Sequence, residues 1–266
     1  MIFVDDGAEK LVLDGEFDIA IPFSVSREAD GEPKITVFPS QKAIADEFLR
    51  RYGASGEFFS PEAVVWAKKQ FEPYFVKIGF APVDDGDTHF LNFRITDPHS
   101  ELILPATREL DGSEDYENLT GYDFAALNHF GHICFGCVVD DKIVSAATTN
   151  YSFMLAEEEP DTRTIEIGVE TAEKYRNQGY GLSCTAALAC FLIDKGYTVL
   201  YECGSDNEAS IALAKKLGGI QSGKNFCVVG HRISDWTARH NWQNKRYIVS
   251  ARSMRRPRPY TFRRRI

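Results

Sequence analysis

The sequence predicts an α/β fold in which a central twisted mixed sheet is flanked by helices. Residues 164–169 alternate apolar and polar side chains, as a strand does, and a glycine-bearing turn then opens a helix at Tyr180. A second strand–helix unit follows over 197–218, and 132–147 reads as a β-hairpin. Strands joined by helices, combined with a hairpin, favour a sheet with both parallel and antiparallel pairs.

The turn between the first strand and its helix indicates a binding site. Gly179 and Gly181 lack side chains where the backbone turns sharply and a ligand could come close. The first N–H groups of the helix have no intrahelical partner and carry the positive end of the helix dipole. Phosphate is therefore the expected ligand. The usual nucleotide-binding patterns, Gly-x-x-x-x-Gly-Lys-Ser/Thr and a complete Gly-x-Gly-x-x-Gly, are not present in the turn.

Three sets of residues resemble a known superfamily. Arg176-Asn-Gln-Gly-Tyr-Gly181 resembles the Gln/Arg-x-x-Gly-x-Gly/Ala motif of the GNAT superfamily of N-acetyltransferases, which holds the pyrophosphate of acetyl-CoA. Asn207-Glu-Ala-Ser210 is similar to the Asn-x-x-Ser motif that opens the next helix in that superfamily. The phrases that look most like the zwittermicin-resistance branch are Asp141-Lys-Ile-Val-Ser145, Ile167-Gly-Val-Glu-Thr171 and Glu202-Cys203. The resemblance covers about residues 116 to 230.

The resemblance implies a GNAT fold and transfer of an acetyl group from acetyl-CoA to a primary amine by direct attack, with no metal or other cofactor. The main chain of Ile167, Gly168 and Val169 would bind the pantetheine and polarise the thioester carbonyl, which is an oxyanion-type role. The other residues expected to bind the cosubstrate lie on the turn and on the next helix: Lys174, Arg176, Asn177, Gln178, Gly179, Tyr180, Gly181, Asn207 and Ser210.

Glu166 is the candidate general base, acting directly or through a water molecule. It lies in the predicted strand on the face opposite Ile165 and Ile167, where several members of the superfamily carry an acid. Burial beside the cosubstrate would raise the pKa of this carboxyl toward neutrality. The alternative is an exposed strand glutamate without a chemical role.

The acid for the leaving thiolate is where the sequence departs from the family pattern. Many members carry a tyrosine about two turns into the helix that follows Asn207, and this chain has Ala214 there. The remaining candidates are Tyr201, Cys203 and Tyr180, and the thiolate could also leave unassisted. This gap supports a second hypothesis, a catalytically weak protein that binds or senses acyl-CoA.

Composition and charge set the broad class. With 266 residues, 44% apolar and 26% charged, the chain is typical of a globular protein, and the net charge is −9. No apolar run approaches the ~20 residues that span a membrane, and the N-terminus lacks a secretory pattern, so we expect a cytoplasmic protein that does not bind membranes. The expected domains are an α+β subdomain over 1–110 that shapes the acceptor site, an acetyltransferase core over 111–251, and an Arg-rich tail over 252–266.

Two sequence features could indicate other functions. His129-x-x-His132-x-Cys134-x-x-Cys137 offers metal ligands, but residues three apart on a strand face opposite sides, so core packing of the cysteines is expected instead. The tail carries seven arginines and no acids, and could reach nucleic acid. The preceding 251 residues carry a charge of −16, which argues against that partner. A small-molecule amine is the expected partner, and no pattern specifies an oligomeric state.

Local signals predict several further elements. A helix over Ser40–Tyr52 would have Ser40 as N-cap, and a second helix would begin at Pro61 and stop at Pro73. Ser205-x-x-Glu208 fits a capping box. Strands are predicted over 18–23, 34–38, 89–95, 101–104 and 226–233, and a short helix over 122–130.

Overall fold

A computed structural model describes residues 1–83, 89–129, 131–150 and 164–233. These residues form β-strands, α-helices and short 3₁₀ turns. The strands are β1 (Ile2–Val4), β2 (Ile19–Glu28), β3 (Lys34–Val37), β4 (Phe80–Pro82), β5 (His89–Ile95), β6 (Thr107–Glu109), β7 (Cys134–Val139), β8 (Lys142–Thr149), β9 (Thr164–Thr171), β10 (Thr198–Gly204) and β11 (Ile220–Arg232). The α-helices are α1 (Asp6–Leu13), α2 (Lys42–Tyr52), α3 (Pro61–Ile78), α4 (Phe124–His129), α6 (Tyr180–Asp194) and α7 (Glu208–Lys216). Three 3₁₀ turns, η1 (Pro39–Gln41), η2 (Ser100–Leu102) and η3 (Glu173–Tyr175), join them.

The described strands form one mixed sheet. Its order is β1-β3-β2-β11-β5-β10-β9-β8-β7-β6, and β4 pairs with β11 beside that path. β9 and β10 are parallel, whereas β7, β8 and β9 pair antiparallel in sequence. The predicted α/β fold with a mixed sheet flanked by helices is therefore confirmed.

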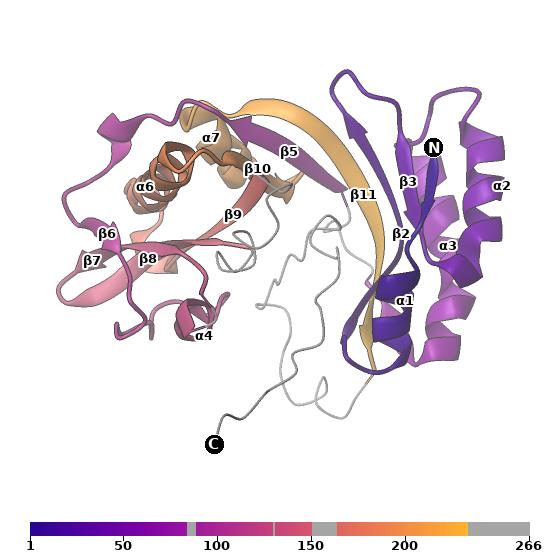
Figure 1. Cartoon of the computed structure of the whole chain (residues 1–266), viewed down its shortest axis with the longest axis horizontal. Coiled ribbons are helices and arrows are strands. Elements are labelled where there is room, and N and C mark those ends of the chain that lie inside the picture. The colour runs from indigo at the N-terminus through magenta and orange to yellow at the C-terminus, as the bar shows by residue number, and fades with distance from the viewer. Residues whose placement is uncertain (84–88, 130, 151–163, 234–266) are drawn as a thin grey trace.

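The long strand β11 lies between β2 and β5 and joins the two halves of this sheet (Figure 1). It pairs with β2 over Gly223–His231 and with β5 over Ile220–Phe226, and each ladder contains a register shift. Such irregularities bend a strand and increase its twist. Helices α1, α2 and α3 lie beside β2 and β3, and α6 lies over β8 and β9 at the other end (Figure 1).

Aromatic side chains fill the core of the N-terminal half. The ring of Phe23 lies 5.1 Å from that of Phe48, 5.4 Å from Phe71 and 5.9 Å from Phe226, measured between ring centroids. Because Phe226 belongs to β11, the late strand completes the core that the first 80 residues build. Aromatic residues of this half that are buried include Phe58, Phe71, Tyr74, Phe75 and Phe80.

A second core surrounds α6. This helix is apolar on almost every side, and eight of its 15 residues are buried between the sheet and η2. It ends before Gly196, whose φ of 84° is the left-handed conformation typical of a residue that follows a helix. A helix held on this many sides has little freedom to shift, so its first turn is fixed relative to β9.

The predicted hairpin of β7 and β8 is confirmed, and Cys134 and Cys137 point to opposite faces of the sheet. Asp140 and Asp141 form the connection with φ angles of 50° and 61°, the left-handed pair that a two-residue hairpin turn needs. Cys134 is buried in a cluster with Phe124, whereas Cys137 is buried in the cluster of α6. The two thiols therefore lie in different cores.

Several local predictions were wrong at element ends. Helix α3 continues through Pro73 and ends at Gly79, which adopts φ 75°. Ser40 lies within the turn η1 rather than at an N-cap, where its main chain and hydroxyl donate to the Glu9 carboxylate. Residues 101–104 carry the turn η2 in place of a strand, and the short helix α4 is confined to Phe124–His129.

Part of the sequence lies outside the described residues. This part includes the connection over 151–163, the C-terminal bound of the predicted core at 251, and the tail at 252–266. Among the described helices, none has both the length and the apolar character needed to cross a membrane.

Candidate functional site

Strands β9 and β10 part from each other in the middle of the sheet. Their ladder pairs Thr164 with Thr198 and continues to Ile167 with Tyr201. Beyond that point β9 remains paired only with β8 as far as Thr171, and β10 remains paired only with β5 as far as Gly204. A fork therefore opens between two parallel strands.

One edge of β9 faces this fork. The N–H of Asn150 donates to the carbonyl of Glu166 at 2.8 Å, so Glu166 directs its main-chain groups toward β8. Since these groups alternate along a strand, those of Ile167 and Val169 are directed toward β10. At Val169 the partner strand has already diverged, which places an N–H donor and a C=O acceptor at the wall of the fork.

The glycine turn lies at the end of the same strand. Asn177 and Gly179 adopt φ angles of 61° and 85°, and Gly179 is the N-cap of α6 with no side-chain hydrogen bond to the helix. The first N–H groups of α6 thus point outward without a capping side chain, as an anion-binding turn requires. A bound diphosphate there would complete their hydrogen bonding.

Gly181 also has a packing role that the sequence did not predict. A Cβ atom at this position would stand 2.7 Å from Oγ1 of Thr171 and 3.7 Å from Cγ2 of Val169. The missing side chain therefore lets the first turn of α6 pack directly against the end of β9. This contact places the uncapped helix start beside the fork.

The predicted cationic and polar side chains surround the turn on its exposed side. Arg176 donates from Nε to the carbonyl of Thr171 at 3.3 Å, and Gln178 donates from Nε2 to the carbonyl of Lys174 at 3.1 Å. The ammonium of Lys174 lies 4.9 Å from the centre of the Tyr175 ring. Two cations, Lys174 and Arg176, thereby lie at the rim of the glycine turn.

Asn207 is the N-cap of α7, which corrects the predicted capping box at Ser205 and Glu208. Its Oδ1 accepts from the N–H of Ser210 at 3.1 Å. Ser210 also lies close enough to Tyr201 to oppose the rise in the pKa of that phenol, and Tyr201 is the last residue of β10 that pairs with β9. The Asn-x-x-Ser motif therefore fixes the start of α7 to the point where the strands separate.

Glu166 is buried, with 7% of its surface exposed, and it is hydrogen-bonded. Nδ2 of Asn150 donates to its Oε1 at 2.6 Å. The carboxylate lies on the face of β9 opposite Ile165 and Ile167, which pack against α6. The alternative of an exposed strand glutamate is excluded by this burial.

Tyr122 is a site residue that the sequence did not reveal. A Cβ atom at Gly168 would stand 2.5 Å from its hydroxyl oxygen, so the phenol lies directly over β9. The carboxylate of Glu170 accepts the N–H groups of Thr120, Gly121 and Tyr122 at 2.8 to 3.0 Å and holds the loop there. Burial, and after it the charges of neighbouring groups, raise the pKa of this phenol well above its ordinary value.

The structure shows where the residues predicted as candidates for the leaving-group acid lie. Ala214 is fully buried in the α6 core. Burial raises the pKa of Tyr201 to about 12 and that of Cys203 to about 11, and both side chains lie in the same core. Tyr180 stands at the start of α6 with its ring 6.2 Å from that of Tyr175.

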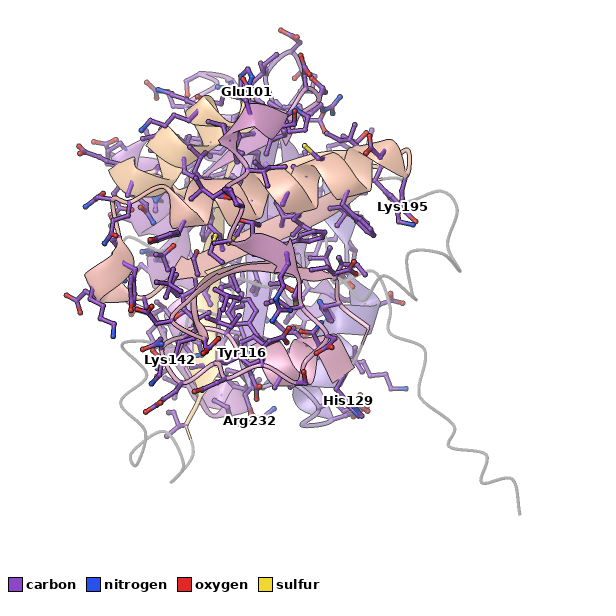
Figure 2. The ribbon with its side chains drawn as sticks, turned by 90° about the vertical axis from the view of Figure 1, so that its left-hand side faces the viewer. Glu101, Tyr116, His129, Lys142, Lys195 and Arg232 are labelled. Atoms are coloured by element: carbon purple, nitrogen blue, oxygen red, sulfur yellow. The ribbon has the colours of Figure 1, made fainter. Side chains whose placement is uncertain are left out.

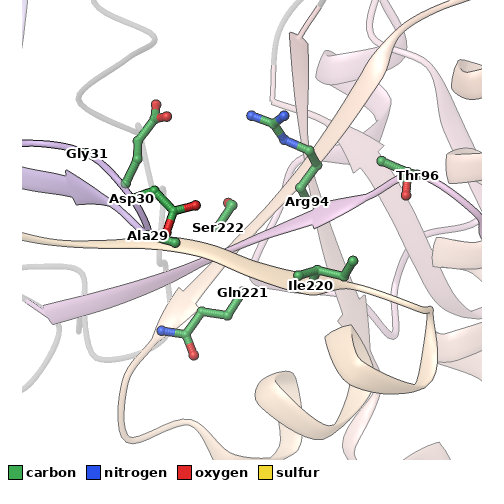
Figure 3. Close-up of a pocket in the computed structure, with 9 residues that line it drawn as sticks. Ala29, Asp30, Gly31, Arg94, Thr96, Ile220, Gln221 and Ser222 are labelled. Carbon is green, nitrogen blue, oxygen red and sulfur yellow. The ribbon is translucent and has the colours of Figure 1, made fainter.

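A surface pocket of about 410 Å³ lies elsewhere (Figure 3). It is formed by the turn after β2 together with parts of β5 and β11, and the residues that line it are Glu28, Ala29, Asp30, Gly31, Arg94, Thr96, Ile220, Gln221 and Ser222. None of the predicted site residues belongs to it.

The fork, the uncapped glycine turn and the buried carboxylate are the features expected of an acyltransferase that uses acyl-CoA. A family model described as GNAT acetyltransferase matches residues 14–224. The chain belongs to this family. Its members transfer an acyl group from acyl-CoA to an acceptor substrate.

Solved structures similar to the chain also come from this family. A GCN5-related N-acetyltransferase-like protein from Streptococcus suis shares 18% identity and a TM-score of 0.42, with 63% of this chain and 68% of that chain covered. An acetyltransferase from the GNAT family of Colwellia psychrerythraea shares 15% identity and a TM-score of 0.40, with coverage of 64% and 75%. The search of curated proteins found no match.

Proposed function

We propose that this chain is an N-acetyltransferase that moves an acetyl group from acetyl-CoA to the primary amine of a small molecule, which would enter beside Glu166. The observation that carries the proposal is the fork between β9 and β10, which ends beside the uncapped start of α6. The diphosphate of CoA would bind the N–H groups of Gln178 to Gly181, with Arg176 and Lys174 adding positive charge. The pantetheine would then run into the fork.

The reaction would proceed by direct attack. The N–H of Val169 would donate to the thioester carbonyl and stabilise the negative charge that develops on its oxygen. Glu166 would accept the proton of the attacking amine, either directly or through a water molecule, because its carboxylate lies on β9 next to the end of the ladder with β10. Asn150 would orient that carboxylate through the hydrogen bond to Oε1. No residue of the chain becomes acylated in this scheme.

A CoA-release assay across a panel of amines tests this function. Steady release of CoA that depends on the amine, with the acetylated amine found by mass spectrometry, would support it. Release that does not depend on any amine would contradict it. The panel should contain amino acids, polyamines, amino sugars and a peptide amine, because these differ in the charge and size of the acceptor.

A second candidate function rests on Ala214. Its methyl group cannot donate a proton, and the side chain is fully buried. A protein without that acid could bind acyl-CoA as a sensor and turn over slowly. Calorimetric titration with CoA, combined with the assay above, separates the two, since tight binding without turnover with any amine would favour the sensor.

Three further assignments complete the proposal. We place the chain in the zwittermicin-resistance branch of the family on the phrases around Ser145, Gly168 and Glu202. The N-terminal half, up to residue 110, would shape the acceptor side of the site. The cytoplasm is the proposed compartment, which the six free cysteines favour, five of them buried.

A further inference from the structure

We propose that Tyr122 is a catalytic residue that donates a hydrogen bond from its hydroxyl to the thioester sulfur as the C–S bond breaks. This inference rests on the proposed function and assigns the role that Ala214 leaves open. It concerns a side chain from the loop before α4, on the opposite face of the sheet from α7.

The first argument is the position of the phenol. Its oxygen would be 2.5 Å from a Cβ atom at Gly168, and Gly168 is the first residue of β9 beyond the ladder with β10. The next main-chain donor along the strand is the N–H of Val169, which faces the fork. A thioester held by that N–H would therefore lie next to the hydroxyl of Tyr122.

The second argument is how firmly the phenol is held. Three successive N–H groups, ending with that of Tyr122 itself, donate to the carboxylate of Glu170. The ring of Tyr122 lies 5.4 Å from the ring of Phe124, which is fully buried. Glu170 and Gly168 belong to the same strand and share a face, so one strand both fixes the loop and makes room for the ring.

The third argument is the chemistry available to this hydroxyl. Burial and the nearby carboxylates of Glu166 and Glu170 keep the phenol protonated, because they raise its pKa above the ordinary value. A protonated phenol is a permanent hydrogen-bond donor at neutral pH, and it does not give up its proton to a thiolate of lower pKa. Tyr122 therefore stabilises charge and is not itself a proton source.

The step balances without any further reactant. The amine nitrogen forms a bond to the carbonyl carbon, and the C–S bond breaks with its electron pair remaining on sulfur. The proton lost by the nitrogen leaves through Glu166 to solvent. The CoA thiolate departs while it accepts the hydrogen bond from Tyr122, and it is protonated later by water.

Tyr122→Phe tests the assignment, since it removes one oxygen and keeps the ring. Tyr116→Phe is the matched control, and Tyr116 is labelled in Figure 2. It lies in the same segment and stacks on the same Phe124 ring at 5.8 Å, but its hydroxyl donates to Glu114 and Asn128. We expect Tyr122→Phe to lower kcat about 100-fold, the usual effect of removing one such donor, and Tyr116→Phe to leave it unchanged.

A second measurement does not depend on turnover. The pKa of the thiol of bound CoA is read from the ultraviolet absorbance of the thiolate, in the wild-type protein and in both variants. A donor to the sulfur stabilises the thiolate, so this pKa should be higher in Tyr122→Phe than in the other two proteins. Equal thiol pKa values, or an unchanged kcat, would overturn the role of Tyr122. Failure of the wild-type protein to bind CoA would instead overturn the proposed function itself.

Discussion

Asn150 holds Glu166 at two points. Its main-chain N–H donates to the Glu166 carbonyl at 2.8 Å, and its side-chain Nδ2 donates to Oε1 at 2.6 Å. The first bond fixes the register of β9 against the end of β8, and the second fixes the direction of the carboxylate. A base that must accept a proton from an incoming amine gains from this restraint, because the direction of its carboxylate is already set.

Replacing Glu166 with glutamine should remove the base and preserve the hydrogen bond from Asn150, since an amide oxygen can replace Oε1. We expect kcat/KM to fall by about 10²- to 10⁴-fold, the usual contribution of a general base. The acidic limb of the pH–rate profile should disappear. CoA affinity, measured by calorimetry, should be unchanged, and a variant that keeps both its rate and its profile would remove Glu166 from the mechanism.

Gly179→Ala should weaken CoA binding through the backbone alone. There is open space around a Cβ atom at this position, but the φ of 85° costs a residue with a side chain about 1–2 kcal/mol. If the turn relaxes to a lower φ, the N–H groups of Gln178 to Gly181 move away from the diphosphate.

Gly56→Ala is the control for that change. Gly56 has a φ of 71° and equally open surroundings, in the connection between α2 and α3. Both variants should lose a similar free energy of unfolding, and only Gly179→Ala should show weaker CoA binding by calorimetry. Equal CoA affinity in the two variants would count against the turn as the diphosphate site.

Gly168→Ala should displace Tyr122. The new methyl group would stand 2.5 Å from the phenol oxygen and 3.1 Å from Cζ, so the loop must shift. Overpacking of this kind lowers the free energy of unfolding by about 1–3 kcal/mol. In the double variant with Tyr122→Phe the nearest clash is gone, so chemical denaturation should show a smaller loss than the sum of the two single changes. Strict additivity would contradict the contact.

Acidification should destabilise the protein between about pH 7 and pH 5. The pKa values of His89, His132 and His231 are lowered in the folded protein, mainly by burial. These side chains therefore bind protons more readily in the unfolded chain, so their contribution to stability is present above the unfolded pKa of about 6.5 and is lost as the pH falls. Denaturation curves across this range check the sign, and glutamine at all three positions should flatten the dependence. A stability that rises on acidification would contradict it.

The strand, the glycine turn and the helix of the site could be predicted because each has a local cause. Alternation marks β9, and Gly179 and Gly196 mark the ends of α6. Glu166 could be assigned to a face for the same reason, since side chains alternate along a strand. The burial of Glu166 and its hydrogen bond from Asn150, however, depend on the neighbouring strand, because Asn150 directly follows β8.

The features that were missed all depend on tertiary contacts. No local pattern predicts the contact between Tyr122 and Gly168, because the two residues are 46 positions apart in the sequence. The one available indication of a close approach was a glycine in the middle of an apolar strand. The sequence predicts a helix end at Pro73, but α3 continues through this residue to Gly79. The Ser60 N-cap and the packing of α3 in the surrounding core stabilise the longer helix. The fork itself follows from the different partners of β9 and β10, which no local pattern contains.

The measurement that tests the central claim most directly is a titration of the ¹⁵N-labelled protein followed through its main-chain amide signals. With CoA, the amides of Gln178 to Gly181 and of Val169 should shift together. With pantetheine, which lacks the diphosphate, the Val169 signal should shift and those of Gln178 to Gly181 should stay in place. If CoA leaves the four turn amides unmoved, the diphosphate does not bind at the start of α6, and the account is wrong.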